Sequence, residues 1–339
     1  MAKAFDIFKQ GSKELLGWLK AAGNHYTIPP EATLVKEGDL NSDLIVLVSG
    51  KICVNTTSKE GNTLDLAELT SGSLFGEMSL LEKRPAVATV KALEECIIWQ
   101  ISHEKISSLQ VSNPELSLEW QQLIAKKLAL QLTKQNEWIY RNVSNVQAIE
   151  PLRKVLILFA SLNECDIYKL AKIGKLMHVE PGCCLVRQGE NVTSLYLLLS
   201  GEAEILIEIN KESKKVGSSC RGEILGEVTF LLPEQRGASA TVKSNGMELL
   251  CLDKQELAKL LKEDPNFGAR FYIALSRMLS QRSRDQLVSR QLSSLSQKKL
   301  IETQAENAAE MDLNELADTS RAGRQFQWLC EKFQMHSKI

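Results

Sequence analysis

The sequence predicts a mainly β protein with flanking helices, in which two tandem β domains are followed by a helical C-terminal tail. Three observations support this prediction: an internal repeat, short apolar runs bounded by turn residues, and an amphipathic helix at the end of each repeat. The chain has 339 residues, a length that suits two domains of ordinary size.

The internal repeat rests on five anchors that recur in the same order, with an offset of 150–152 residues. The paired anchors are Gly38 and Gly189, Ser49-Gly50 and Ser200-Gly201, the segments from Gly72 and Gly222, the segments from Ala86 and Ala238, and Asn113-Pro114 and Asp264-Pro265. Such self-similarity indicates a duplication in which single residues were gained or lost in loops.

The strands of each repeat are predicted from short apolar runs between glycine, serine, asparagine and aspartate residues. Leu44–Val48 and Leu195–Leu199 are such runs, and residues 203–209 alternate between apolar and polar side chains. Closely spaced short strands with glycine turns are typical of a closed or double-sheet β fold.

Helices are predicted at the end of each repeat and before the first strand. Asn113 and Asp264 are good N-cap residues, and each is followed by a proline that suits the first helical position. The apolar stripes consist of Trp120, Ile124, Leu128 and Leu132 in the first helix, Phe267, Phe271, Ala274 and Met278 in the second, and Phe5, Phe8, Leu15, Leu16 and Leu19 in one N-terminal amphipathic helix.

The ordered motifs, from the first glycine through Ser-Gly, Gly-x-x-x-Gly-Glu and Ala-Thr-Val to a terminal helix, resemble the cyclic-nucleotide-binding domain family. Members include bacterial catabolite activators and the regulatory subunit of cAMP-dependent protein kinase. The resemblance covers about residues 5–140 and 152–285. It implies two tandem β-jelly-roll domains, which we place at residues 1–148 and 149–285, with a helical tail at 286–339.

The resemblance also implies a phosphate-binding cassette in each domain. In the family, a short helix follows a Gly-Glu pair, its first N–H groups point at the cyclic phosphate, and the glutamate accepts the ribose 2′-hydroxyl. The candidate ligand-binding residues carried over on this basis are Gly76, Glu77, Met78, Ser79, Ala88 and Thr89 in the first domain, and Gly226, Glu227, Val228, Thr229, Arg236, Ala240 and Thr241 in the second.

Both domains depart from the family at the arginine that pairs with the phosphate, because Ala86 and Ala238 stand at that position. Losing a charge-assisted hydrogen bond weakens binding by about 10- to 150-fold. Arg84 and Arg236 lie two residues earlier and are candidate substitutes. Arg236 keeps the family's spacing from its glutamate, whereas Arg84 is closer and precedes the stiff Pro85, so cAMP or cGMP is expected at the second domain rather than the first.

A structural interpretation stays open beside the ligand-binding one. Gly76 and Gly226 would then serve only tight turns, and Glu77 and Glu227 would cap backbone N–H groups. Both pockets would be degenerate, and the protein would be a scaffold subunit of a larger assembly. Whether Arg84 or Arg236 faces its pocket distinguishes the two interpretations.

The tail offers a third alternative, a transcription regulator with an eroded helix-turn-helix. Leu313–Arg321 faintly resembles such a motif, but the spacing is about three residues too short for the turn. Seven basic and seven acidic residues balance one another in the tail, which disfavours DNA binding. We expect instead a helical tail whose apolar residues pack on the second domain or on a partner: Leu292, Leu295, Leu300, Phe326 and Leu329.

Composition and motifs argue against an enzyme, a metal protein and a membrane-spanning protein. The net charge is −1, no apolar run approaches the 20 residues or so that a bilayer requires, and the N-terminus lacks the apolar core of a signal peptide. The eight cysteines form no Cys-x-x-Cys pair, the four histidines lie far apart, and no nucleotide-hydrolysing, protease or kinase signature occurs. We expect a cytoplasmic location.

The leading hypothesis is therefore a non-catalytic regulatory or adaptor protein with two partly degenerate sensor domains. It would act through protein–protein contacts, with a protein partner or a second copy bound through the terminal helices. Ligand binding would tighten a cassette and move the helix at 113–140 or 265–300.

Overall fold

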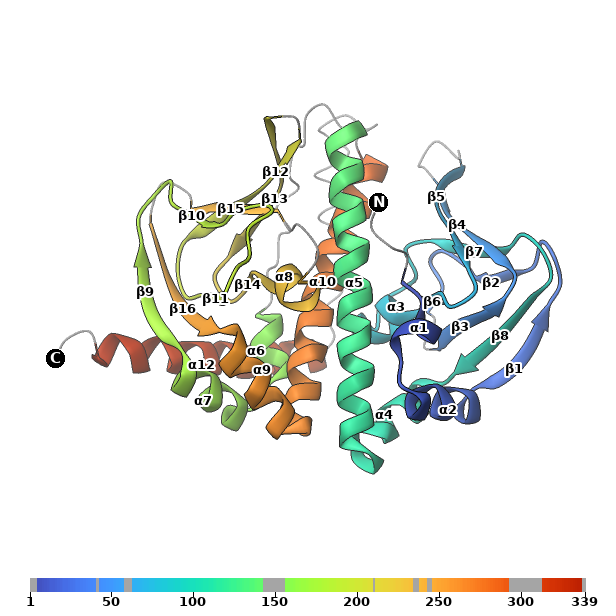
Figure 1. Ribbon diagram of the computed structural model, residues 1–339, viewed down its shortest axis with the longest axis horizontal. Helices are drawn as coiled ribbons and strands as arrows, with labels where there is room; N and C mark the ends of the chain where they lie inside the picture. The colour runs from blue at the N-terminus through green and yellow to red at the C-terminus, as the bar shows by residue number, and fades with distance from the viewer. Residues whose placement is uncertain are drawn as a thin grey trace.

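The computed structural model describes residues 5–40, 43–57, 63–142, 156–209, 211–233, 238–242, 246–292 and 313–336. Two β domains lie on either side of a pair of long helices, α5 (Pro114–Asn142) and α10 (Pro265–Leu292), as Figure 1 shows. The two domains repeat the same succession of elements, which confirms the tandem mainly β fold predicted from the sequence.

The elements of the first domain are α1 (Ile7–Gln10), α2 (Lys13–Ala22), β1 (Asn24–Ile28), β2 (Thr33–Val35), β3 (Leu44–Ser49), β4 (Lys51–Thr57), β5 (Thr63–Thr70), β6 (Leu74–Phe75), α3 (Glu77–Glu82), β7 (Thr89–Ala92), β8 (Cys96–Ile101), α4 (His103–Ser112) and α5. Those of the second are α6 (Ile157–Ser161), α7 (Glu164–Ile173), β9 (Lys175–Val179), β10 (Cys184–Val186), β11 (Ser194–Leu198), β12 (Glu202–Ile209), β13 (Glu212–Cys220), β14 (Ile224–Leu225), α8 (Glu227–Leu231), β15 (Ser239–Val242), β16 (Met247–Asp253), α9 (Lys254–Glu263) and α10. Helix α12 (Leu313–His336) follows.

Each domain is a sandwich of two antiparallel sheets. The sheet orders are β1-β8-β3-β6 and β2-β7-β4-β5 in the first domain, and β9-β16-β11-β14 and β10-β15-β12-β13 in the second. Consecutive strands pass between the two sheets, except that the β4–β5 and β12–β13 hairpins each stay within one sheet, as in the jelly-roll topology.

The continuous apolar strands arise because one sheet of each sandwich is covered on both faces. In β3, Ile45 and Leu47 point into the sandwich, whereas Leu44 and Val46 belong to the core shared with the helices. A strand buried on both faces needs apolar side chains at every position, which explains why residues 44–48 show no alternation.

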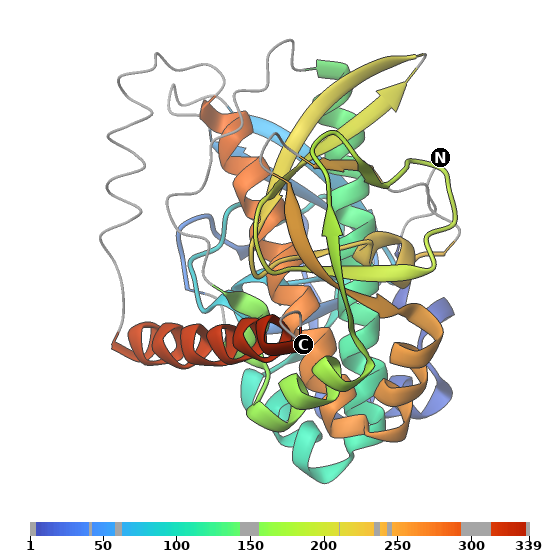
Figure 2. The same cartoon turned by 90° about the vertical axis from the view of Figure 1, so that its left-hand side faces the viewer.

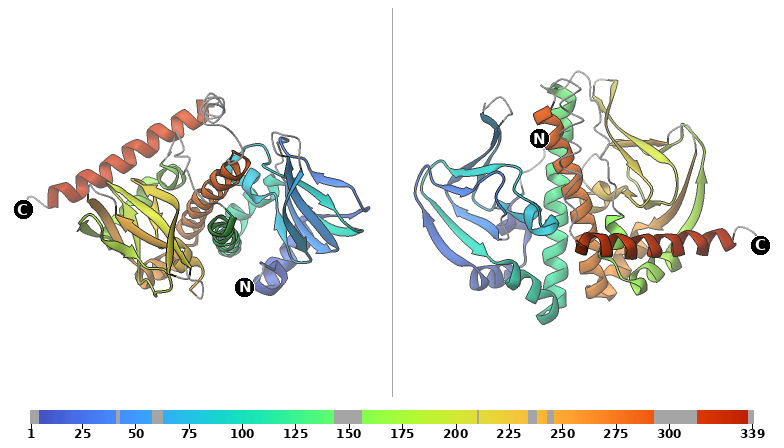
Figure 3. Two further views of the ribbon diagram at one scale, coloured as in Figure 1. Left: turned by 90° about the horizontal axis from the view of Figure 1, so that it is seen from above. Right: turned by 180° about the vertical axis from the view of Figure 1, so that it is seen from behind.

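Helices α5 and α10 run parallel between the two sandwiches, and Figure 3 shows the pair from above. Gln131 bonds to Ser283 and Asn136 to Gln286, so the two helices are aligned at nearly the repeat offset of 151 residues. Their apolar stripes merge into one core that continues into both domains. At Gly268 the helices lie close together, because a Cβ atom there would lie 2.7 Å from a methyl carbon of Leu118.

The predicted caps are confirmed at both long helices. Asn113 accepts the N–H of Leu116 at 3.0 Å, and Asp264 accepts that of Phe267 at 3.0 Å. The single N-terminal helix is corrected to two short helices, α1 and α2. Ser12 caps α2 and breaks the longer helix, because its N–H and hydroxyl both bind the Glu119 carboxylate of α5.

The C-terminal helix α12 packs on the second domain (Figure 2). Phe326 meets Phe159 of α6 edge to face at 5.0 Å, and Leu329 is fully buried. The stretch Leu313–Arg321 lies in one uninterrupted helix, so within residues 313–336 there is no helix-turn-helix. The Leu292 side chain, Leu295 and Leu300 lie outside the described residues.

The predicted border at 148/149 lies outside the described ranges, and the border at 285/286 falls inside α10, which continues to Leu292. Across the described ranges, no helix has the length and apolar character needed to span a bilayer.

Candidate functional site

The two cassettes begin with the same backbone turn. We define the first cassette as residues 76–82 and the second as residues 226–231. Gly76 and Gly226 precede the short helices α3 and α8 with φ angles of 91° and 86°, a left-handed conformation that favours glycine. A side chain at Gly226 would also crowd the Ser194 carbonyl oxygen, 3.0 Å from the ideal Cβ position. The turn into each short helix therefore requires glycine.

The first cassette's glutamate is held by a lysine from α5. Glu77 is the first residue of α3 and is only 2% exposed. Its Oε1 forms an ion pair with Lys127 Nζ, whose side chain is also largely buried. A buried carboxylate needs such a partner.

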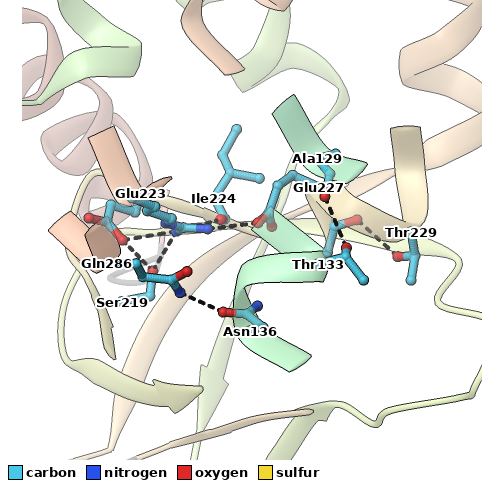
Figure 4. A network of polar contacts seen from close by, with 11 residues as sticks. Ala129, Thr133, Asn136, Ser219, Glu223, Ile224, Glu227, Thr229 and Gln286 are labelled. Carbon is cyan, nitrogen blue, oxygen red and sulfur yellow. Dashed lines mark hydrogen bonds and ion pairs between the residues drawn. The ribbon is translucent and has the colours of Figure 1, made fainter. Parts of the chain in front are cut away.

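The second cassette's glutamate is held by an arginine from α10, and Figure 4 shows Ser219, Glu223 and Glu227 around that guanidinium. Arg282 Nη1 donates to Glu227 Oε1 at 2.7 Å, and Nη2 donates to Glu223 Oε2 at 3.0 Å, to Ser219 Oγ at 3.2 Å and to the Ile224 carbonyl at 3.3 Å. Burial alone would lower the pKa of Arg282, but the two carboxylates raise it above its ordinary value, so the guanidinium stays charged.

In each glutamate one carboxylate oxygen is left over. Oε2 of Glu77 and Oε2 of Glu227 accept no hydrogen bond from any part of the chain that the structure describes. Each glutamate can therefore be paired with its helix and still accept a hydroxyl from a ligand.

The arginine position of the first domain is closed. Ala86 is 9% exposed and belongs to the apolar cluster inside the sandwich. Its carbonyl accepts the N–H of Gly38 at 2.9 Å, and its own N–H bonds to the Asp39 carbonyl at 2.9 Å. Arg84 is exposed to solvent, and Ala86 itself supplies no guanidinium at this position.

The corresponding position of the second domain is more open. Ala238 is only partly buried, beside the small cluster of Ile139, Ile207 and Val216. Arg236, the predicted substitute, lies outside the described residues.

The other predicted cassette residues lie in the first turns of α3 and α8. Ser79 and Thr229 are buried, whereas Met78 and Val228 are half-buried. Thr229 Oγ1 donates to the Gly226 carbonyl at 3.0 Å and accepts from Lys254 Nζ at 2.8 Å. Burial lowers the pKa of Lys254 to about 8, and only the nearby Glu227 opposes this shift.

The predicted strand residues sit near β7 and β15. Ala88 precedes β7, and Thr89 begins it, with Oγ1 accepting the Glu37 N–H at 3.1 Å. Ala240 is buried inside the second sandwich, and Thr241 pairs with Cys184 of β10.

Sequence reasoning missed the two cations that hold the glutamates, although the apolar pattern contained a signal for each. Continuing the second apolar stripe from Met278 by four residues reaches Arg282, a charged residue on a buried helix face. Lys127 likewise follows Leu123 by four residues. A charge within an apolar stripe predicts a buried partner, which here is the cassette glutamate.

Comparison with known proteins gives a family for both domains. The cyclic nucleotide-binding domain family matches residues 26–113 and 176–264, which together make up just over half of the chain. Each match includes one cassette and the sandwich around it.

Curated relatives include protein kinases and their regulatory subunits. A cGMP-dependent protein kinase of Caenorhabditis briggsae is 26% identical over 260 residues, covering 76% of this chain and 30% of the relative. A cAMP-dependent protein kinase regulatory subunit of Yarrowia lipolytica is 29% identical over 190 residues, covering 56% of this chain and 42% of the relative. The chain thus spans less than half the length of these relatives.

Solved structures with a similar fold include the regulatory domain of Toxoplasma gondii protein kinase A with cAMP. It is 17% identical, with a TM-score of 0.31, and 82% of this chain and 92% of that chain are covered. The regulatory subunit of a cAMP-independent protein kinase A from Trypanosoma cruzi, bound to guanosine, is 19% identical, with a TM-score of 0.29. The match covers 77% of this chain and 81% of that chain.

Proposed function

This chain belongs to the cyclic nucleotide-binding domain family, and we propose that it is a non-catalytic regulatory protein whose second domain binds a cyclic purine nucleotide weakly. Its first domain is degenerate as a nucleotide site. The protein acts on a protein partner through its helices, and the ligand is cAMP or cGMP.

The observation that carries this proposal is the link between each cassette and a long helix. Glu77 is tied to Lys127 of α5, and Glu227 is tied to Arg282 of α10. A ligand hydroxyl that bonds to the free oxygen of such a glutamate would change the strength of its ion pair. The helix pair would then pass the occupancy of the pocket to a partner, as a shift between two helix positions.

The choice of the second domain rests on the two arginine positions. Ala86 is buried among apolar side chains and offers no charge to a phosphate. Ala238 is partly exposed, and the sequence places Arg236 at the family's spacing from Glu227. The first domain then contributes packing contacts and binds no nucleotide, as the scaffold interpretation assumed for both domains.

Titration calorimetry with cAMP and cGMP tests the proposal. We expect one bound nucleotide per chain with a dissociation constant above about 10 µM, because the family's arginine is missing from its usual place. The 2′-deoxy nucleotide lacks the hydroxyl for Glu227 and should bind about tenfold more weakly.

A matched pair of variants locates the site. Arg236→Ala should abolish the heat of binding, whereas Arg84→Ala, at the corresponding place in the first domain, should leave it unchanged. No heat from either nucleotide at millimolar concentration would overturn the ligand proposal. Loss of binding in Arg84→Ala alone would assign the ligand to the first domain.

A further inference from the structure

The first cassette is bound by the second domain as well as by its own. Glu82, the last residue of α3, accepts hydrogen bonds from Ser280 Oγ and, at 2.5 Å, from Arg284 Nε, and both donors belong to α10. Arg284 Nη1 also donates to the Pro85 carbonyl at 3.0 Å. Helix α10 thus reaches the end of the cassette and the residue directly before Ala86.

These contacts are largely removed from water. The side chains of Arg284 and Glu82 are 12% and 9% exposed. Arg284 Nη2 is buried and has no hydrogen-bond partner among the residues that the structure describes. The hydrogen bonds to Glu82 and Pro85 therefore have to offset the free-energy cost of removing this guanidinium from water.

Among the residues that the structure describes, the second cassette has no counterpart of this clamp. At the repeat offset of 151 residues, Ala129 and Thr133 of α5 stand where α10 has Ser280 and Arg284. Thr133 Oγ1 donates to the Ala129 carbonyl of its own helix at 2.9 Å. Leu232 stands where the first domain has Glu82, so α5 contacts α8 there without an ion pair between described residues.

One helix therefore holds both cassettes. Ser280 and Arg284 are four residues apart and share a face of α10, whereas Arg282 lies between them on a different face. The first face binds the first cassette and the other binds Glu227 and Glu223 of the second domain. A shift or rotation of α10 must alter both sets of contacts.

We propose that Arg284 and Ser280 are positioning residues for the first cassette, so that the loop from Glu82 to Thr89 keeps its conformation only while α10 of the second domain is docked. The first domain is then not an independent unit. The consequence for ligands rests on the proposed function: a nucleotide that engages Glu227 changes the first cassette through α10.

Amide hydrogen exchange on the full chain, without ligand, tests the clamp. In Arg284→Ala, exchange in residues 82–89 should rise by about tenfold or more, while residues 226–231 change by less than about twofold. Thr133→Ala is the matched control at the corresponding position of α5 and should change neither segment. Chemical unfolding of each variant shows whether the chain stays folded.

If Arg284→Ala does not fold, Arg284→Lys serves the same purpose, because an ammonium offers one nitrogen where the guanidinium binds Glu82 through Nε and Pro85 through Nη1. Unchanged exchange in residues 82–89, or an equal rise in both cassettes, would overturn the proposal. The readout needs no nucleotide, so a failure of nucleotide binding leaves this test intact. If calorimetry does show binding, added cAMP or cGMP should change exchange in residues 82–89 of the wild type but not of Arg284→Ala.

Discussion

The two cassettes begin with the same backbone turn and differ in what holds them. The first is fastened at its start by Lys127 of its own domain and at its end by Arg284 of the other domain. The second is fastened at its start by Arg282, which also neutralises Glu223, and it has no ion pair at its end within the described residues. Duplication copied the fold, and later substitutions gave each copy its own set of cations.

The difference shows that the helix pair is not symmetric in its contacts, although it is nearly symmetric in shape. Met278 stands where the first helix has Lys127, and Gln131 stands where the second has Arg282. Arg282 therefore lies one helical turn further along α10 than Lys127 does along α5. Each of these cations pairs with the glutamate that begins a short helix. Ser280 and Arg284 lie on a different face of α10 and bind Glu82 of the first cassette.

The largest effect is expected from Arg282→Met. The change removes the guanidinium that pairs with the buried Glu227 and the partly buried Glu223, which should lower the free energy of unfolding by about 3–5 kcal/mol. Denaturant unfolding measures it. Gln131→Met, at the corresponding position of α5, removes only neutral hydrogen bonds and should cost about 1 kcal/mol. Equal losses in both variants would show that the arginine network is no stronger than its neutral counterpart.

A smaller loss is expected from Lys127→Met. Only Glu77 is left unpaired, so the free energy of unfolding should fall by about 2–3 kcal/mol. Lys126→Met at the neighbouring position, where the side chain is partly exposed, serves as the control and should change stability by less than about 0.5 kcal/mol. If Lys127→Met behaves like the control, Glu77 is not held by this pair.

The smallest effect is expected in the pH dependence of the free energy of unfolding, and it comes from Lys254, which binds Thr229 of the second cassette. The pKa of Lys254 is about 8 in the folded chain and 10.5 for an ordinary lysine, so the unfolded chain holds this proton more tightly between those values. The stability of the wild type relative to Lys254→Met should therefore rise by about 1 kcal/mol from pH 7 to pH 10, after allowance for solvent screening of this half-buried group.

Unfolding curves at the two pH values measure this difference, in which groups common to both proteins cancel. A constant difference between wild type and Lys254→Met would contradict the account of Lys254.

The sequence was sufficient for the repeat, the jelly-roll domains, the helix caps and the glycine turns, because each depends on local patterns. The uninterrupted apolar run Leu44–Val48 predicts a buried strand, and the N-cap residue Asn113 predicts the start of a helix. The partners of Glu77 and Glu227 lie 50 and 55 residues away on other elements, so their identity depends on packing. Glu82 and Arg284 are 202 residues apart and belong to different domains, and no local pattern joins them.

The split of the N-terminal helix shows the same limit. Phe5, Phe8, Leu15 and Leu19 do face the core, as their spacing predicts. The break at Ser12 depends on Glu119, which is 107 residues further along the chain. The tail likewise forms one helix over Leu313–His336, because its apolar face finds α6 rather than a second helix of its own.

The most direct test of the unequal fastening is a double-mutant cycle between Glu82 and Arg284. The single variants Glu82→Ala and Arg284→Ala and the double variant are unfolded by denaturant. A direct contact between the domains predicts a coupling free energy of about 1–3 kcal/mol. The reference cycle of Glu82→Ala with Thr133→Ala should be additive within about 0.5 kcal/mol. Additive effects of Glu82→Ala and Arg284→Ala would contradict the conclusion that the second domain holds the first cassette.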